Sequence, residues 1–165
     1  MAFVLGRDFA DDEAATLEER FAAYYKYLES VRDKLPPSAY SFAVASWHYD
    51  PQDHRCPHDS WVDSLTIIET PYDEHKAHRD IEINVRLLGA YHDGRLELSY
   101  KKVRSYQLET PPDYKMLPLN VGHGDWLSDE VRLSERTLVL HEVEFTRGSR
   151  WVIECQDILS QWTPL

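Results

Sequence analysis

His58–Val62 reads His-Asp-Ser-Trp-Val, and His123–Leu127 reads His-Gly-Asp-Trp-Leu. The two histidines and the two tryptophans are each 65 positions apart (123 − 58 and 126 − 61). Each segment leads into apolar residues interleaved with polar ones, a pattern that is typical of a half-buried β-strand. The shared beginning therefore predicts that one strand module occurs twice in the chain.

A later pair of segments extends this match at a shorter offset. Residues 96–100 (LELSY) align with residues 151–155 (WVIEC), and Val103 aligns with Ile158, an offset of 55 (158 − 103). A duplication of this kind predicts a pseudo-symmetric sheet in two similar halves. The two predicted strand modules cover about residues 58–108 and 123–162.

One long amphipathic helix is predicted before the first module, over about residues 12–35. Its apolar residues recur at alternating steps of four and three, which is the stripe of a helix that packs on one face. They are Leu17, Phe21, Tyr24, Leu28, Val31 and Leu35. Pro36 and Pro37 follow the stripe and end the predicted helix.

The rest of the chain alternates with a period of two. Residues 40–47 predict a strand, and 157–162 predict a short closing turn. Further strands are expected at 61–68, 81–87, 95–100, 106–108, 126–133, 138–145 and 150–155. Neither module contains a crossover helix, so the sheet should be mainly antiparallel and the fold α+β, in one domain over 1–165. Trp61 and Trp126 are expected as equivalent buried anchors.

Composition and charge restrict the classes of function. The 165 residues carry 18 basic and 29 acidic side chains, a net charge of −11, which argues against nucleic acid and anionic membranes as partners. No apolar run approaches the ~18 residues of a membrane span. Cys56 and Cys155 are interpreted as reduced thiols of a cytoplasmic protein. The sequence lacks a phosphate-binding glycine loop and a Gly-x-Ser-x-Gly motif, so no cofactor is assigned and an enzyme is the less favoured class.

The densest group of reactive side chains lies in the predicted loop His48–Asp59. Histidine, cysteine and carboxylate are the ligand types that bind zinc, and a metal site here would use His54, Cys56, His58 and Asp59, with His123. The two histidines beside Cys56 also suggest an activated thiol. In the structural alternative, the same residues cap turns and satisfy loop backbone groups.

Three tyrosines on the predicted helix suggest a contact surface. Tyr24, Tyr25 and Tyr27 are too close together in the sequence to face inward together. Tyr24 belongs to the apolar stripe, so Tyr25 and Tyr27 are the predicted binding residues. Tyrosine is enriched among residues that contribute most to protein interfaces.

A motif in the first module resembles a known group of proteins. It comprises a leading His-Asp pair, an alternating apolar strand and a valine after the following hairpin: His58, Asp59, Val62, Leu65, Ile67 and Val103. This layout, over about residues 58–162, resembles small uncharacterised bacterial α+β proteins, some of which are similar to immunity proteins that neutralise toxins. The second copy departs from it, with Gly124 where Asp59 stands.

The resemblance implies a protein-binding role and supplies no catalytic residues. Two hypotheses follow for the chain. The first is a non-enzymatic, immunity-like interaction protein whose acidic surface meets a basic protein partner, with self-association left open. The second is a metal-binding protein or metal-dependent enzyme that uses the loop His48–Asp59.

Overall fold

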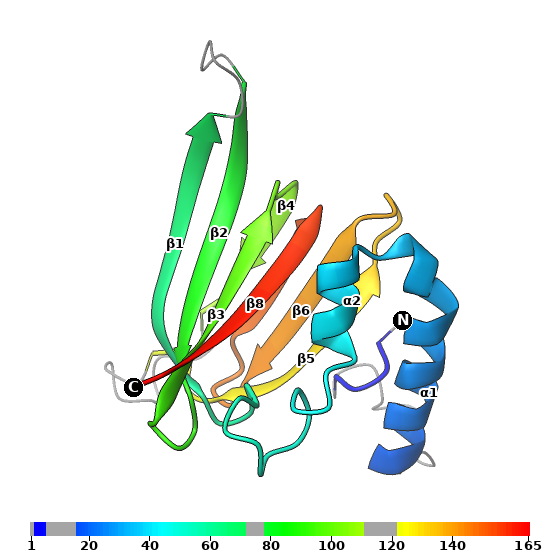
Figure 1. Cartoon of the computed structure of the whole chain (residues 1–165), viewed down its shortest axis with the longest axis vertical. Coiled ribbons are helices and arrows are strands. Elements are labelled where there is room, and N and C mark those ends of the chain that lie inside the picture. The colour runs from blue at the N-terminus through cyan, green and yellow to red at the C-terminus, as the bar shows by residue number, and fades with distance from the viewer. Residues whose placement is uncertain (1, 6–15, 72–77, 111–121) are drawn as a thin grey trace.

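The computed structural model describes residues 2–5, 16–71, 78–110 and 122–165 (Figure 1). Within these ranges the chain forms a long helix, a 3₁₀ turn, a short helix and eight strands. In chain order they are α1 (Leu17–Val31), η2 (Arg32–Lys34), α2 (Pro37–Ala43), β1 (Trp61–Pro71), β2 (Arg79–Leu88), β3 (Gly94–Lys101), β4 (Ser105–Leu108), β5 (Trp126–Leu133), β6 (Val139–Phe145), β7 (Arg150–Cys155) and β8 (Asp157–Pro164).

The strands form two four-stranded sheets in which all neighbours are antiparallel. One sheet has the order β1-β2-β3-β8, and the other has the order β4-β7-β6-β5. The predicted α+β class and antiparallel pairing are therefore confirmed.

Each sheet takes its fourth strand from the other half of the chain. β4 follows β3 in sequence but pairs with β7, and β8 follows β7 but pairs with β3. Read from the opposite end, the second sheet has the order β5-β6-β7-β4, which matches β1-β2-β3-β8. Both β1 and β5 also carry a register shift within their first four residues. The duplication itself stays a prediction.

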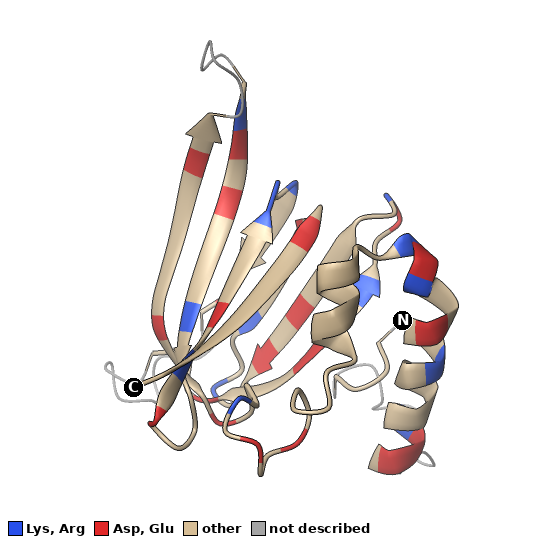
Figure 2. Ribbon diagram, in the orientation of Figure 1, with Lys and Arg blue, Asp and Glu red and all other residues tan. Residues whose placement is uncertain are grey.

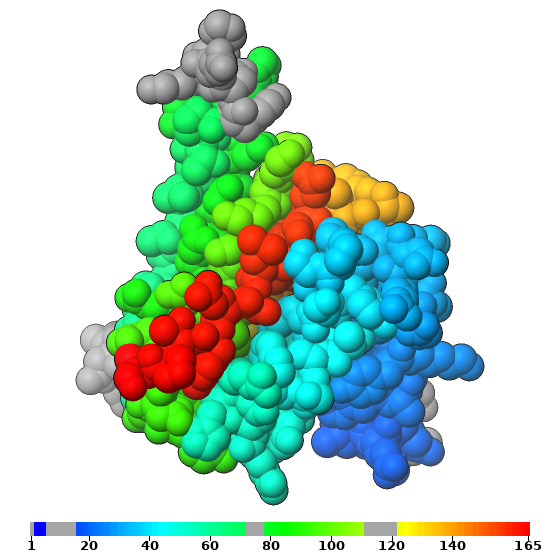
Figure 3. Space-filling model, in the orientation of Figure 1, coloured from blue at the N-terminus to red at the C-terminus, as the bar shows by residue number. Residues whose placement is uncertain are grey.

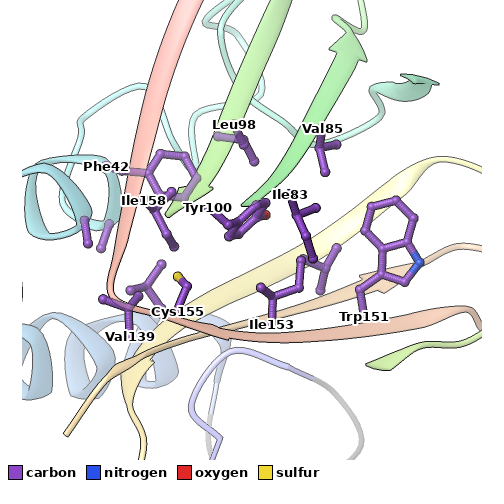
Figure 4. Close-up of a cluster of buried hydrophobic side chains, with 14 of the residues drawn as sticks. Phe42, Ile83, Val85, Leu98, Tyr100, Val139, Trp151, Ile153, Cys155 and Ile158 are labelled. Atoms are coloured by element: carbon purple, nitrogen blue, oxygen red, sulfur yellow. The ribbon is translucent and has the colours of Figure 1, made fainter. Parts of the chain in front are cut away.

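The core lies between the two sheets, because alternate side chains of each strand point to opposite faces (Figure 4). Aromatic and β-branched residues from both sheets meet there with Phe42 of α2. The labelled members are Phe42, Ile83, Val85, Leu98, Tyr100, Val139, Trp151, Ile153, Cys155 and Ile158.

Only one of the two predicted tryptophan anchors belongs to this core. Trp126 is 0% exposed and packs edge-to-face against Phe145, with ring centroids 5.5 Å apart. Trp61 is 50% exposed, so the prediction of two buried anchors was wrong. The difference arises because the indole of Trp61 bonds to the surface carboxylate of Asp125 and does not enter the space between the sheets.

Helix α1 is shorter than predicted and packs along the edge of β5. Thr16 caps it and forms a capping box with Glu19, so the helix starts at Leu17; the predicted residues 12–15 lie outside the described residues. Leu17 is 61% exposed and does not continue the buried stripe. Tyr24 and the later stripe residues are buried, which confirms that the helix packs on the sheet through this face.

The prediction of a strand at residues 40–47 was wrong. The first helical segment ends at Lys34, before Pro36 and Pro37, as predicted; Pro37 then opens α2, because proline is well tolerated in the first turn of a helix. The buried residues Ala39, Phe42 and Ala43 follow helical spacing. Figure 3 shows α2 and the loop after it packed against the C-terminal strand β8.

The predicted closing turn at 157–162 is also corrected. This segment is β8, an eight-residue strand paired with β3 along its whole length. Its inward residue Trp162 lies against the backbone of Gly94, where an added Cβ would come within 2.0 Å of the indole ring. The strand is therefore fixed by tertiary packing.

Candidate functional site

Asp129 accepts hydrogen bonds from three side chains in the interior. Its Oδ2 atom lies 2.8 Å from Nε2 of His48 and 2.8 Å from Nε2 of His141. Its Oδ1 atom accepts a 2.9 Å bond from the indole N–H of Trp126. Asp129 and the two histidines are each at most 1% exposed. We call His48, Tyr100, Asp129 and His141 the buried polar centre.

The hydrogen-bond partners fix the protonation of this centre. Nδ1 of His48 lies 2.9 Å from the carbonyl oxygen of Phe42. When Asp129 is ionised, both partners of His48 are acceptors, so both ring nitrogens donate and the ring is a cation. Nδ1 of His141 lies 2.8 Å from the hydroxyl of Tyr100, and a neutral ring satisfies both of its contacts. The centre therefore pairs one positive with one negative charge.

The environment keeps Asp129 ionised. Burial by itself favours a higher pKa for this carboxyl group. The charge of His48 and the hydrogen bonds from His141 and His48 oppose burial and hold the pKa of Asp129 well below its usual range. Burial raises the pKa of Tyr100 well above its usual value, so the phenol remains protonated. Asp129 is thus favoured as a carboxylate and Tyr100 as a phenol.

The geometry of the centre favours a structural role over catalysis. A general acid–base histidine needs a ring nitrogen directed at its substrate. Both nitrogens of His48 and both of His141 already have partners inside the protein. A cavity of about 420 Å³ reaches His48 and Asp129, but apolar residues such as Phe21 and Leu127 form much of its wall. The centre instead links α2 to β3, β5 and β6.

Asp129 and His141 were not predicted as site residues, although one signal was available. His141 stands between Val139 and Val143 in an alternating strand, at a position that faces inward. A polar side chain at an inward position requires a buried partner. The sequence does not identify that partner, because Asp129 and His48 come from distant segments.

A second group of site residues lies at the surface, where the loop after α2 meets the β2–β3 turn. The His54 ring stacks on Tyr91, with ring centroids 4.1 Å apart, and its Nδ1 atom contacts the carboxylate of Asp93. Tyr91 is 50% exposed, and its hydroxyl donates to the carbonyl of Pro51 at 3.1 Å. The exposed tyrosine ring is therefore held in one orientation.

Trp61 is held in the same manner at the start of β1. Its indole N–H donates to Oδ1 of Asp125 at 2.7 Å, and its ring meets the His92 ring edge-on with centroids 4.8 Å apart. His92 has a φ of 58°, in the left-handed region that few side chains adopt without strain. The turn is thus shaped so that an imidazole supports the exposed indole.

His58 connects this region to β5. Its Nδ1 atom lies 2.7 Å from the carbonyl oxygen of Leu127, and its Nε2 atom lies 3.5 Å from the Asp59 carboxylate. Asp59 has a φ of 61°, and its N–H donates to the backbone of β5. Leu127 is 43% exposed.

These contacts join into one surface, which we call the aromatic–acidic surface. Figure 2 shows acidic residues along the loops at the bottom of the view, where residues 48–60 run. The members are His54, His58, Asp59, Trp61, Tyr91, His92, Asp93, Asp125 and Leu127.

Apart from the pair His58–Asp59, the predicted metal ligands have separate partners. His54, His58 and Asp59 belong to the aromatic–acidic surface, whereas the Cys56 thiol is buried and donates to a backbone carbonyl of its own loop. His123 bonds to a serine hydroxyl beside β7 at 2.8 Å. In the described part of the chain, no three His, Cys, Asp or Glu residues are grouped to hold a metal ion. Zinc binding stays a prediction, and calorimetric titration of tag-free protein tests it.

The suggestion of an activated thiol at Cys56 is corrected. Its side chain is removed from solvent, and burial raises its pKa to about 11. The neighbouring histidines do not offset this effect, because His54 points to Asp93 and His58 points to β5. At neutral pH Cys56 is therefore a protonated, unreactive thiol.

The two predicted binding tyrosines of α1 differ in environment. Tyr25 is 42% exposed. Tyr27 is partly buried, stacks on Phe3, and accepts a 2.9 Å hydrogen bond from the backbone N–H of Leu133. Tyr27 thus supports the fold, and the binding role of Tyr25 stays a prediction.

Comparison with known proteins gives no guide to function, because no protein-family model, curated protein or solved structure matches the chain. Within the described ranges, no helix is both long and apolar enough to cross a membrane.

Proposed function

We propose that this chain is a non-enzymatic, immunity-like protein-interaction domain, which binds a basic partner through the aromatic–acidic surface. The observation that carries the proposal is the half-exposed Trp61, held in place by Asp125 and His92. Tryptophan, tyrosine and arginine supply most of the binding energy of protein interfaces. An aromatic ring that is already fixed loses little conformational freedom on binding, so less of its binding free energy is lost to the entropic cost of ordering.

Charge supports a basic partner. Asp125 accepts from the Trp61 indole, Asp93 contacts the His54 ring that stacks on Tyr91, and the whole chain carries −11. An arginine or lysine of a partner can lie over an indole or phenol ring and pair with a neighbouring carboxylate. The excess negative charge also speeds encounter with a basic protein at low salt.

Affinity capture tests this proposal. The wild-type chain, the double variant Trp61→Ala/Tyr91→Ala and the control Leu159→Ala are immobilised and exposed to lysate of the source organism. Leu159 is exposed to a similar degree, 43%, on β8. We expect a basic protein that the wild type and the control retain, that the double variant loses, and that elutes as salt increases. If no retained protein depends on Trp61 and Tyr91, the proposal is wrong.

Two expectations about compartment and origin belong to the same proposal. A cytoplasmic location is supported by Cys56 and Cys155, which are both free and buried. An origin by internal duplication is supported by the common order of β1-β2-β3-β8 and β5-β6-β7-β4.

A further inference from the structure

The two outer strands β1 and β5 occupy equivalent places at the ends of the two sheets, yet their free edges differ. Each is the first strand of its module and the terminal strand of its sheet. A terminal strand exposes backbone N–H and C=O groups that can pair with another chain, so proteins usually protect such edges. The way each edge is protected therefore shows where pairing is blocked and where it is open.

Three tyrosine hydroxyls protect the edge of β5. Tyr49 donates to the carbonyl of Asp129 at 2.8 Å. Tyr24 accepts from the N–H of Val131 at 2.8 Å and lies 3.1 Å from its carbonyl oxygen. Tyr27 accepts from the N–H of Leu133. The backbone groups of alternate β5 residues are thus bonded to tyrosine hydroxyls, at positions where a further strand would otherwise pair.

The edge of β1 has no such protection. Among the described residues, no backbone or side-chain group bonds to the outer edge between Ser64 and Ile68, and the Thr66 hydroxyl turns to the β2 backbone. β1 is 11 residues long, about twice the common strand length, and it is the outermost strand on the left of Figure 1. After the register shift near its start, the edge of β1 is therefore regular and open from Ser64 to Ile68.

The side chains of β1 suit an added strand. Residues 66–69 are all exposed, and Ile67 and Ile68 are 40% and 43% exposed. Threonine and isoleucine are the residue types that favour pleated pairing. An extended segment lying beside them would cover apolar surface on both faces of the sheet.

We propose that β1 is the docking edge for an extended basic segment of the partner, which adds to the first sheet as a fifth strand. This inference rests on the proposed function, because the edge begins at Trp61 and so runs directly from the aromatic–acidic surface. Main-chain pairing would supply affinity, while Asp59 and Asp125 at that end would select lysine or arginine. The occupant is thus defined by charge complementarity and by an extended backbone.

The test uses hydrogen–deuterium exchange on the full chain with a defined probe, a short fluorescein-labelled peptide of alternating lysine and valine. The matched control peptide has glutamate in place of lysine. We expect the basic peptide to protect alternate amides of residues 64–70, and to bind about tenfold or more tightly than the acidic one.

Proline variants at two neighbouring positions of β1 test the edge, because one of the two must remove an N–H group that points outward. Successive N–H groups of an edge strand point alternately to the neighbouring strand and outward. Of Thr66→Pro and Ile67→Pro, one therefore breaks pairing with β2 and lowers the melting temperature, and the other leaves it nearly unchanged. The tolerated variant should lose amide protection and bind the basic peptide about tenfold more weakly.

The outcomes separate this inference from the proposed function. If Trp61→Ala weakens binding of the basic peptide but no amide of β1 becomes protected, the interaction surface stands and the docking edge is wrong. If neither Trp61→Ala nor the tolerated proline alters binding, both are wrong. Protection of β1 that rises with protein concentration alone would identify a second copy as the occupant and overturn the basic segment.

Discussion

Asp129 is the buried carboxylate that holds the polar centre together. Its carboxylate accepts from two imidazoles and an indole, and one imidazole is a buried cation. Replacing Asp129 with Asn leaves His48 charged without a counterion or strands one of its donors. We expect a loss of about 3–5 kcal/mol in the free energy of unfolding, measured with urea. Asp93→Asn, which changes an exposed pair with His54, should cost at most about 1 kcal/mol.

The pH dependence of this loss follows from the depressed pKa of Asp129. A carboxyl group with a lower pKa in the folded state stabilises the protein above its unfolded pKa of ~3.9. That contribution disappears as the pH falls from ~3.9 towards the folded pKa. The difference in stability between wild type and Asp129→Asn should therefore shrink as the pH falls below ~4. A difference that grows as the pH falls below ~4 would contradict the ionised state assigned to Asp129.

The two thiols give a separate prediction at the residue scale. Burial raises the pKa of Cys56 to about 11 and that of Cys155 to about 12. Only the thiolate attacks an alkylating reagent, so at pH 8 both native thiols should react with iodoacetamide about a hundredfold or more slowly than in urea. Rapid modification of Cys56 in the native protein would restore the activated-thiol interpretation.

The sequence predicted which residues lie at the site better than it predicted which residues they contact. His54, His58 and Asp59 lie on one surface, as their density in the loop suggested, but their partners Tyr91 and Leu127 come from elsewhere in the chain. Periodicity gives the face on which a side chain lies and not the residue it meets. This is why the buried polar centre remained hidden.

At the scale of elements, tyrosines of α1 protect the edge of β5, and the expected cost of removing a hydroxyl depends on how deeply that tyrosine is buried. Tyr24→Phe leaves the backbone N–H of Val131 buried without its partner and should cost about 1–3 kcal/mol. Tyr27→Phe, at a partly buried site, should cost about 0.5–1.5 kcal/mol. Tyr25→Phe, 42% exposed on the same helix, is the control and should change stability by less than about 0.5 kcal/mol.

Chemical denaturation of the three variants measures this order, and amide exchange at Val131 adds an independent reading. Equal costs at Tyr24 and Tyr25 would show that the hydroxyl groups do not protect the strand edge.

Elements with a strong local period were predicted well, and those defined by distant contacts were not. The alternation in β2 and β3 gave both strands to within two residues at each end. The sequence predicts a strand where α2 forms, because seven residues show too few helical turns to separate the two periods. It predicts a turn where β8 forms, because the partner strand β3 lies more than fifty residues earlier. Local patterns carry little information about such a pairing.

At the scale of the whole molecule, the exchange of β4 and β8 makes each sheet depend on both halves of the chain. The strand module of the first half forms β1, β2 and β3 but lacks β8, which brings Ile158 and Trp162 to that sheet. The second half lacks β4 and also the residues of α2 and its loop that complete the buried polar centre. Neither half therefore contains a complete core.

We expect fragments 1–110 and 111–165 to be unfolded when expressed separately and to form a native complex when mixed. Burial of apolar surface shared by both fragments drives the assembly, as it drives folding of the intact chain. Circular dichroism and tryptophan fluorescence of the mixture should match those of the intact protein. The matched control is fragment 111–156, which ends before β8 and should not complement 1–110. Cooperative unfolding of either fragment alone would contradict this mutual dependence and show that the exchanged strands are accessory to two independent units.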